Sequence, residues 1–158
     1  MATTNLSNHD LEKLPSASQL KIGLVVSEWN SSITENLYQG AVETLLELGA
    51  QKENLIRLNV PGSYELVFGS KKLLQQDTFD AVIAIGCVIQ GETKHFDFVC
   101  EAVSQGIKDL NLQYDKPTIF CVLTDNNIAQ SKARSGGELG NKGVEAAVAA
   151  VKMAYLTL

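Results

Sequence analysis

Residues 91–95, Gly-Glu-Thr-Lys-His, combine residue types suited to anion binding and proton transfer. They follow the apolar run 81–85 (AVIAI), which predicts a strand buried on both faces. A strand that enters a helix through a Gly-containing turn leaves backbone N–H groups free at the helix start, and these favour an anion. His95 would then lie in the first turn, where a side chain that titrates near neutral pH can move protons beside that anion. On local pattern alone, Thr93 is also compatible with a plain helix N-cap, and a lone histidine at a helix start is more often an exposed bystander.

Apolar runs and helical spacing predict four strands that alternate with five helices. The strands are expected at 20–27, 55–60, 80–89 and 118–123, and the helices at 31–48, 63–75, 94–112, 128–135 and 141–155. Strict alternation predicts an α/β protein, a three-layer α/β/α sandwich around a four-stranded parallel, flavodoxin-like sheet. The last helix follows a Gly-rich break and is apolar on most sides, which indicates burial and suggests contact with other subunits.

Four loops follow the carboxyl ends of the predicted parallel strands, so they are expected to meet at one edge of this sheet. Ligands of such folds bind at that edge. They are residues 29–30, 62–65, 87–95 and 120–125. Trp29, the only tryptophan, is expected in an exposed loop, where its ring can stack on a planar ligand. The chain contains neither GxGxxG nor GxxxxGK[ST], so a dinucleotide or nucleoside-triphosphate enzyme is not supported.

Composition indicates one globular domain. The chain has 158 residues, 45% hydrophobic and 20% charged, and we expect a single domain at 19–158 after a polar, flexible N-terminal arm at 1–18. A net charge of −5 without a basic stripe argues against nucleic-acid binding, and no apolar run is long enough for a membrane span. The arm has no signal-peptide pattern, and three cysteines without CxxC or metal-ligand spacing fit a reducing cytoplasm.

Several motifs, in one order and spacing from about residue 21 to residue 156, carry a resemblance to a known family. They are Trp29-Asn30 with Ile33-Thr34, 60–65 (VPGSYE), 86–96 (GCVIQGETKHF), 122–124 (VLT), and 140–143 (GNKG) before an Ala-rich helix. On these motifs the sequence resembles lumazine synthase. The resemblance implies condensation of 5-amino-6-ribitylaminouracil with 3,4-dihydroxy-2-butanone 4-phosphate in riboflavin biosynthesis. The products would be 6,7-dimethyl-8-ribityllumazine, phosphate and water, with no cofactor or metal.

The resemblance also implies a role for each matched residue. His95 would be the catalytic proton shuttle, and Glu92, Thr93 and Arg134 would bind phosphate, with Arg134 supplied by an adjacent subunit. The pyrimidine and ribityl groups would contact aromatic rings, polar side chains and backbone: Trp29, Asn30, Ser63, Tyr64, Glu65, Cys87, Val88, Ile89, Phe120 and Lys142. Two positions depart from the family pattern. Trp29 replaces the usual Phe, and Glu92 replaces a small residue, so its backbone rather than its carboxylate would face the anion.

Assembly is a further implication of the resemblance. Members of the family form homopentamers with active sites between subunits, and many stack twelve pentamers into an icosahedral shell. Members that stay pentameric tend to carry an insertion between the last two helices. Residues 134–142 show none, which favours the shell, although Gly137-Glu138 replaces a common Thr-Lys pair. Small-molecule substrates and, as a candidate, riboflavin synthase would be the other partners.

Three other functions are alternatives to this interpretation of the sequence. An archaeal-type riboflavin synthase of the same fold would use the lumazine as substrate, but the motif around His95 argues against it. A flavin- or lumazine-binding carrier or shell protein would share the binding residues and form no product. A flavodoxin-like electron carrier would need a phosphate loop rich in Ser and Thr after the first strand, which residues 27–30 do not resemble.

Overall fold

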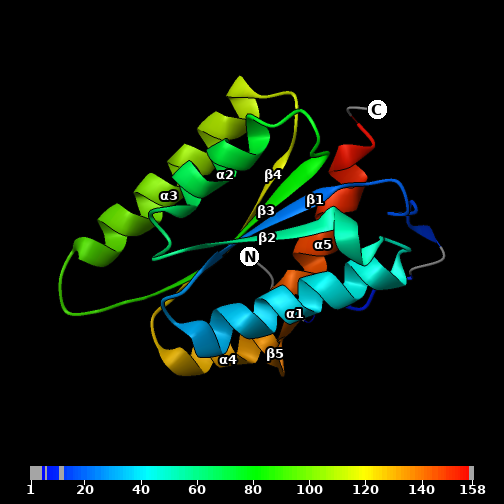
Figure 1. The fold of residues 1–158 in the computed structure, drawn as a ribbon. Coiled ribbons are helices and arrows are strands. Elements are labelled where there is room, and N and C mark those ends of the chain that lie inside the picture. Colours follow the sequence, from blue (N-terminus) through cyan, green and yellow to red (C-terminus); the bar gives the residue numbers. More distant parts are fainter. Residues whose placement is uncertain (1–4, 6, 11–12, 157–158) are drawn as a thin grey trace.

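A four-stranded parallel sheet forms the centre of the protein (Figure 1). The structure is a computed structural model that describes residues 5, 7–10 and 13–156. The strand order is β2-β1-β3-β4, with β1 at Ile22–Ser27, β2 at Leu55–Val60, β3 at Ala81–Ile89 and β4 at Thr118–Asp125. All three pairings are parallel, so every strand ends at the same edge of the sheet. The expected flavodoxin-like α/β fold is confirmed.

Helices cover both faces of the sheet (Figure 1). Helices α2 (Leu66–Leu74) and α3 (His95–Gln113) lie on one face, and α1 (Ser31–Glu47) and α5 (Lys142–Ala154) lie on the other. The short helix α4 (Ile128–Arg134) follows β4, near the start of α1. A 3-10 turn at Lys52–Asn54 precedes β2.

Two hydrophobic clusters hold the layers together, one on each face. Side chains of a strand alternate between faces, so Leu24 and Val26 pack toward α1 and α5, whereas Val25 packs toward α2 and α3. In β3 the residues Ile83 and Ile85 belong to the first cluster, and Val82 and Ala84 belong to the second. Strands β1 and β3 are therefore buried on both faces, as their apolar runs predicted.

The Gly-rich break before α5 is a small hairpin. Its strands, β5 (Ser135–Gly137) and β6 (Gly140–Asn141), pair antiparallel. Gly136 has φ 109° and Gly140 has φ 79°, backbone values that residues with a Cβ rarely adopt. The sequence predicted the break at these glycines but not the strand pairing, because the pairing is too short to leave an apolar pattern.

Helix α5 packs deep within its own chain. Ala147, Ala150, Val151 and Ala154 are fully buried, and the helix contacts α1, β3 and β4. Its expected burial is confirmed. However, this burial arises within one chain and does not by itself require another subunit.

Two element boundaries differ from expectation. Helix α2 begins at Leu66 rather than at residue 63, because residues 63–65 form a turn in which the Glu65 side chain accepts a bond from the Gly62 N–H. Strand β4 extends to Asp125 rather than to residue 123, because it stays paired with β3 as far as Ile89.

The described part of the N-terminal arm contacts the core. Ala17 is fully buried and its N–H donates to the Leu48 carbonyl at 2.8 Å. The Tyr155 hydroxyl donates to the Ser16 carbonyl at 2.7 Å. The remainder of the expected arm, residues 1–4, 6 and 11–12, lies outside the described residues. Flexibility of the arm and a domain boundary at residue 19 stay predictions.

Candidate active site

The loops at the strand ends are joined to one another. The Asn30 side-chain amide, just after β1, donates to the Cys87 carbonyl of β3 at 2.9 Å. The Gln90 N–H after β3 donates to the Asp125 carbonyl of β4 at 2.9 Å. These contacts place the loops after β1, β3 and β4 at one rim, as the strand alternation predicted.

Trp29 lies on the rim with 66% of its surface exposed. Its backbone N–H donates to the Pro61 carbonyl at 3.0 Å, which brings the loops after β1 and β2 together. The indole packs on Gly62, where an added Cβ would come within 2.6 Å of Cζ3. The expected exposed loop is confirmed, and the ring is available to a planar ligand.

Asn30 has an unusual backbone conformation. It is the only non-glycine residue with positive φ, 59°, among those the structure describes. Asparagine tolerates this left-handed region better than most residues. Because its side chain already bonds to the Cys87 carbonyl, that carbonyl keeps one lone pair for a ligand.

The turn after β2 presents a buried hydroxyl and a positioned carboxylate. Glu65 Oε2 accepts a hydrogen bond from the Gly62 N–H at 3.0 Å, while Tyr64 is 60% exposed. Ser63 is 6% exposed, and its hydroxyl has no hydrogen-bond partner among the described residues. Leaving such a group unpaired costs about 1–3 kcal/mol, so Ser63 favours a ligand or water that can bond to it.

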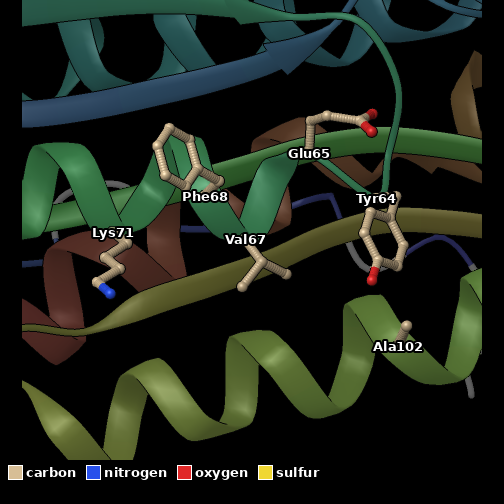
Figure 2. Close-up of a pocket in the computed structure, with 6 residues that line it drawn as sticks. All are labelled: Tyr64, Glu65, Val67, Phe68, Lys71 and Ala102. Atoms are coloured by element: carbon tan, nitrogen blue, oxygen red, sulfur yellow. The ribbon is translucent and has the colours of Figure 1, made fainter.

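A pocket of about 360 Å³ opens beside this turn, between α2 and α3 (Figure 2). It is lined mainly by apolar surface from both helices: Tyr64, Glu65, Val67, Phe68, Lys71 and Ala102. Only Tyr64 and Glu65 were expected near a site. Phe68, 64% exposed on α2, could have been noticed as an aromatic outside the apolar stripe of its helix.

The turn after β3 carries the expected phosphate and proton-transfer groups. Val88 and Ile89 end the strand half-buried, whereas Glu92, Thr93 and His95 are exposed. Helix α3 begins at His95, whose N–H donates to the Thr93 hydroxyl at 3.3 Å. The position of His95 at the start of the helix is confirmed. In Figure 1 the connection from β3 carries the start of α3 well away from the end of β3.

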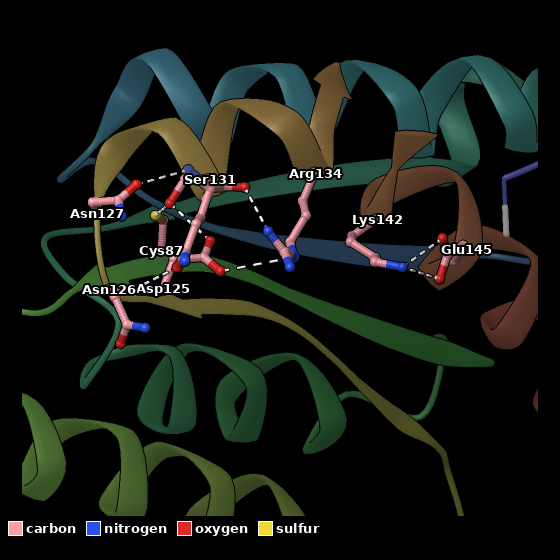
Figure 3. A network of polar contacts seen from close by, with 9 residues as sticks. Cys87, Asp125, Asn126, Asn127, Ser131, Arg134, Lys142 and Glu145 are labelled. Atoms are coloured by element: carbon pink, nitrogen blue, oxygen red, sulfur yellow. Dashed lines mark hydrogen bonds and ion pairs between the residues drawn. The ribbon is translucent and has the colours of Figure 1, made fainter. Parts of the chain in front are cut away.

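Arg134 ends α4 beside a buried carboxylate (Figure 3). Its Nε lies 3.8 Å from Asp125 Oδ1, and its Nη1 donates to the Gln130 carbonyl at 3.0 Å. The second oxygen of Asp125 accepts a bond of 2.8 Å from the Ser131 hydroxyl, which in turn accepts one from the Cys87 thiol at 3.5 Å. The sequence placed the loop of Asp125 at the rim but carried no signal for this network, because it depends on how α4 folds back.

Lys142 and Phe120 lie on different faces. Lys142 begins α5, and its ammonium bonds both oxygens of Glu145 at 2.8 and 2.9 Å (Figure 3). Phe120 is 42% exposed in edge strand β4 and, by alternation, shares the α2 and α3 face with Val122. Within the described ranges no hydrogen bond or ion pair joins Lys142 or Arg134 to His95, which begins a helix on the other face.

The buried cysteines are poor nucleophiles. Burial raises the pKa of the Cys87 thiol, and the Asp125 carboxylate raises it further, while the bond to Ser131 opposes both effects. Burial raises the pKa of Cys121 to about 12.

Among the residues that the structure describes there is no group of His, Cys, Asp and Glu that could hold a metal ion. Nor does this part of the chain contain a helix long and apolar enough to cross a membrane.

The fold defines a flavodoxin-like α/β protein, with its candidate site at the carboxyl ends of the strands. Residues 19–157 match the sequence model of the 6,7-dimethyl-8-ribityllumazine synthase family, and the chain belongs to that family. Its enzymes are transferases of riboflavin biosynthesis. The resemblance inferred from the motifs is confirmed.

Individual relatives agree with the family match. The 6,7-dimethyl-8-ribityllumazine synthase of Christiangramia forsetii is 62% identical over 159 residues, covering 99% of this chain and 95% of its own length. The same enzyme of Flavobacterium johnsoniae is 63% identical over 158 residues, covering 99% and 83%. That of Parabacteroides distasonis is 53% identical over 155 residues, covering 97% of both chains.

Proposed function

We propose that this chain condenses 5-amino-6-ribitylaminouracil with 3,4-dihydroxy-2-butanone 4-phosphate to form 6,7-dimethyl-8-ribityllumazine, in active sites shared between subunits of a homo-oligomer. Membership of the family supports the reaction. The positions of the candidate site residues support active sites that are shared between subunits. The proposal includes assembly of twelve pentamers into a shell and a location in the cytoplasm. The three free cysteines support the location.

The separation of the site residues is the observation that favours shared sites. One group surrounds the rim and the start of α3: Trp29, Asn30, Ser63, Tyr64, Glu65, Cys87, Val88, Ile89, Glu92, Thr93 and His95. Phe120 shares the α2 and α3 face with His95, but Arg134 and Lys142 lie at the ends of α4 and α5. Because α5 and α3 are on opposite faces of the sheet, a neighbouring chain can bring Arg134 and Lys142 to His95.

The chemistry assigned to these groups follows the order of bond changes. The substrate amine attacks the ketone carbon, water leaves, and an imine forms. Loss of a proton from the adjacent carbon then lets phosphate leave with the C–O electron pair and gives an enol. A proton returns to the terminal carbon, which turns the enol into a methyl ketone, and the ribitylamine nitrogen adds to this carbonyl and closes the ring with loss of a second water. His95 can accept and return these protons, because an imidazole titrates close to neutral pH. Arg134 and the N–H groups near Thr93 would stabilise the departing phosphate.

The reaction is tested by lumazine fluorescence after the two substrates are mixed with purified protein. We expect product from the wild type above the uncatalysed rate, and at least about hundredfold less from His95→Ala, the range over which proton transfer contributes. Arg134→Ala should lower activity at limiting phosphorylated substrate. If the wild type formed no more product than the uncatalysed mixture, a binding or shell function would replace the enzyme.

Shared sites are tested by complementation. His95→Ala and Arg134→Ala chains would be unfolded together, refolded as mixed oligomers and assayed. If His95 and Arg134 of one site come from different chains, random mixing restores about a quarter of the sites, because each interface is heterologous. Oligomers of each variant alone are the control. Mixed oligomers no more active than these controls would place both residues in one chain. Light scattering on the wild type would separate a pentamer from a shell.

A further inference from the structure

A row of buried polar groups runs from the end of β3 to Arg134. We propose that Asp125 and Ser131 are positioning residues, which hold the Arg134 guanidinium in the orientation that binds the phosphate of the substrate. The proposal rests on the proposed function, because these residues act only through the phosphate-binding arginine.

Ser131 fixes one end of Asp125. It is fully buried on α4, and its hydroxyl donates to Asp125 Oδ2 at 2.8 Å. The Cys87 thiol donates to the same hydroxyl oxygen at 3.5 Å. Since the oxygen accepts on one side, its own proton is directed to Asp125, and the carboxylate cannot rotate without losing this bond.

Asp125 in turn orients Arg134 (Figure 3). Its Oδ1 faces Arg134 Nε at 3.8 Å, an ion pair longer than a hydrogen bond. The Gln130 carbonyl accepts from Nη1 on another side, so the guanidinium is restrained by its own helix and by the end of β4. A guanidinium has five N–H donors, so donors remain for an anion after these two contacts.

Orientation should outweigh electrostatic competition. An unrestrained arginine loses rotamer freedom when it binds, equivalent to as much as about thirtyfold in affinity. A carboxylate about 7 Å from a bound phosphate dianion weakens phosphate binding by about sevenfold in a water-like medium. The net expectation is that Asp125 improves phosphate binding by about fourfold, a size usual for coupled neighbouring residues.

The test compares two variants that disturb the row differently. Asp125→Asn keeps an acceptor for Ser131 and removes the charge facing Arg134. Ser131→Ala keeps the charge and frees the carboxylate to rotate. We expect each to raise the KM for 3,4-dihydroxy-2-butanone 4-phosphate, by about fourfold for Asp125→Asn and by about twofold for Ser131→Ala, with the KM for the pyrimidine substrate unchanged.

Matched controls separate positioning from general damage. Ser70→Ala removes an equally buried hydroxyl from α2, and Lys132→Ala removes an exposed cation from α4. Neither side chain belongs to the row, so neither substitution should change the KM for either substrate. In the Arg134→Ala background, Asp125→Asn should produce no further increase, because the residue through which it acts is gone.

Three results would overturn the proposal. They are equal increases in both KM values, full additivity of Asp125→Asn with Arg134→Ala, and tighter phosphate binding in Asp125→Asn, which would make the carboxylate a competitor. Calorimetric titration with inorganic phosphate measures phosphate binding without turnover, so it tests the orientation of Arg134 separately from the proposed reaction. A wild type that forms no lumazine contradicts the reaction. The phosphate affinities of the same variants still decide whether Asp125 and Ser131 orient Arg134.

Discussion

The indole of Trp29 covers Gly62 so closely that a side chain at position 62 would overlap it, with Cζ3 only 2.6 Å from the added Cβ. The absence of a side chain at position 62 gives the indole its space. The position of the ring is therefore set jointly by the loops after β1 and β2.

Gly62→Ala should displace the indole and weaken binding of the pyrimidine substrate. We expect a severalfold higher KM for that substrate, because a stacking contact contributes about 0.5–1.5 kcal/mol. Trp29 is the only tryptophan, so its fluorescence reports the displacement directly. A Phe at position 29 is smaller, and Gly62→Ala should be less harmful in the Trp29→Phe background. Unchanged fluorescence and KM in Gly62→Ala would contradict this packing.

Asn30 combines a left-handed backbone with a bond to the Cys87 carbonyl. Asn30→Gly removes the bond but also removes the Cβ from the left-handed region, and it should lower the free energy of unfolding by about 1 kcal/mol. Asn30→Ala removes the same bond and keeps a Cβ in that region, so it should cost about 1 kcal/mol more than the glycine variant. Urea unfolding of the two variants measures the difference. Equal stabilities of the two would show that φ at this position relaxes.

Gly143 lies where α5 approaches the backbone of α1 closely. An added Cβ would overlap the Leu37 carbonyl, a backbone atom that cannot rotate away. We expect Gly143→Ala to destabilise the protein by about 3 kcal/mol or more. Gly91→Ala is the matched control, since a Cβ there meets nothing within 4 Å. Thermal unfolding compares them, and similar melting temperatures would contradict so close an approach of the two helices.

The Glu35–Arg57 pair should make stability depend on acid pH. The hydrogen bond and charge of Arg57 lower the pKa of Glu35 below 4.5, despite an opposing effect of burial. The pair therefore stabilises the folded state above pH 4.5, and this contribution disappears as pH falls through the lowered pKa. For a partly exposed pair it should be at most about 1 kcal/mol. Wild type and Glu35→Gln should differ in urea unfolding at about pH 7, and the difference should shrink as the pH falls below 4.5 and through the lowered pKa. If the two proteins differed by the same free energy of unfolding at every pH, the charge of Glu35 would not be the cause of the difference.

The sheet and the rim could be predicted from the sequence because both depend on local patterns. Alternating apolar segments predicted the strands and helices in their order along the chain, and the loop of Trp29 and the helix start at His95 followed from them. The turn at Gly62 was harder to predict, since α2 begins only at Leu66 and the Glu65 side chain before it accepts a bond from the Gly62 N–H. The contacts of Ser131 were not accessible at all. They depend on the three-dimensional return of α4 to β3, for which neither spacing nor residue type carries a signal.

The uneven burial of α3 divides the helix into parts of different local stability. Its buried residues are Val103, Ile107 and Leu110, so the first two turns of the helix, which follow His95, have little cover within one chain. Local opening is governed by such contacts, so backbone amides after His95 should exchange with deuterium well before those near Ile107 in a dissociated chain. Slower exchange of these first two turns on assembly would therefore measure, residue by residue, how much of the site is ordered by a neighbouring subunit.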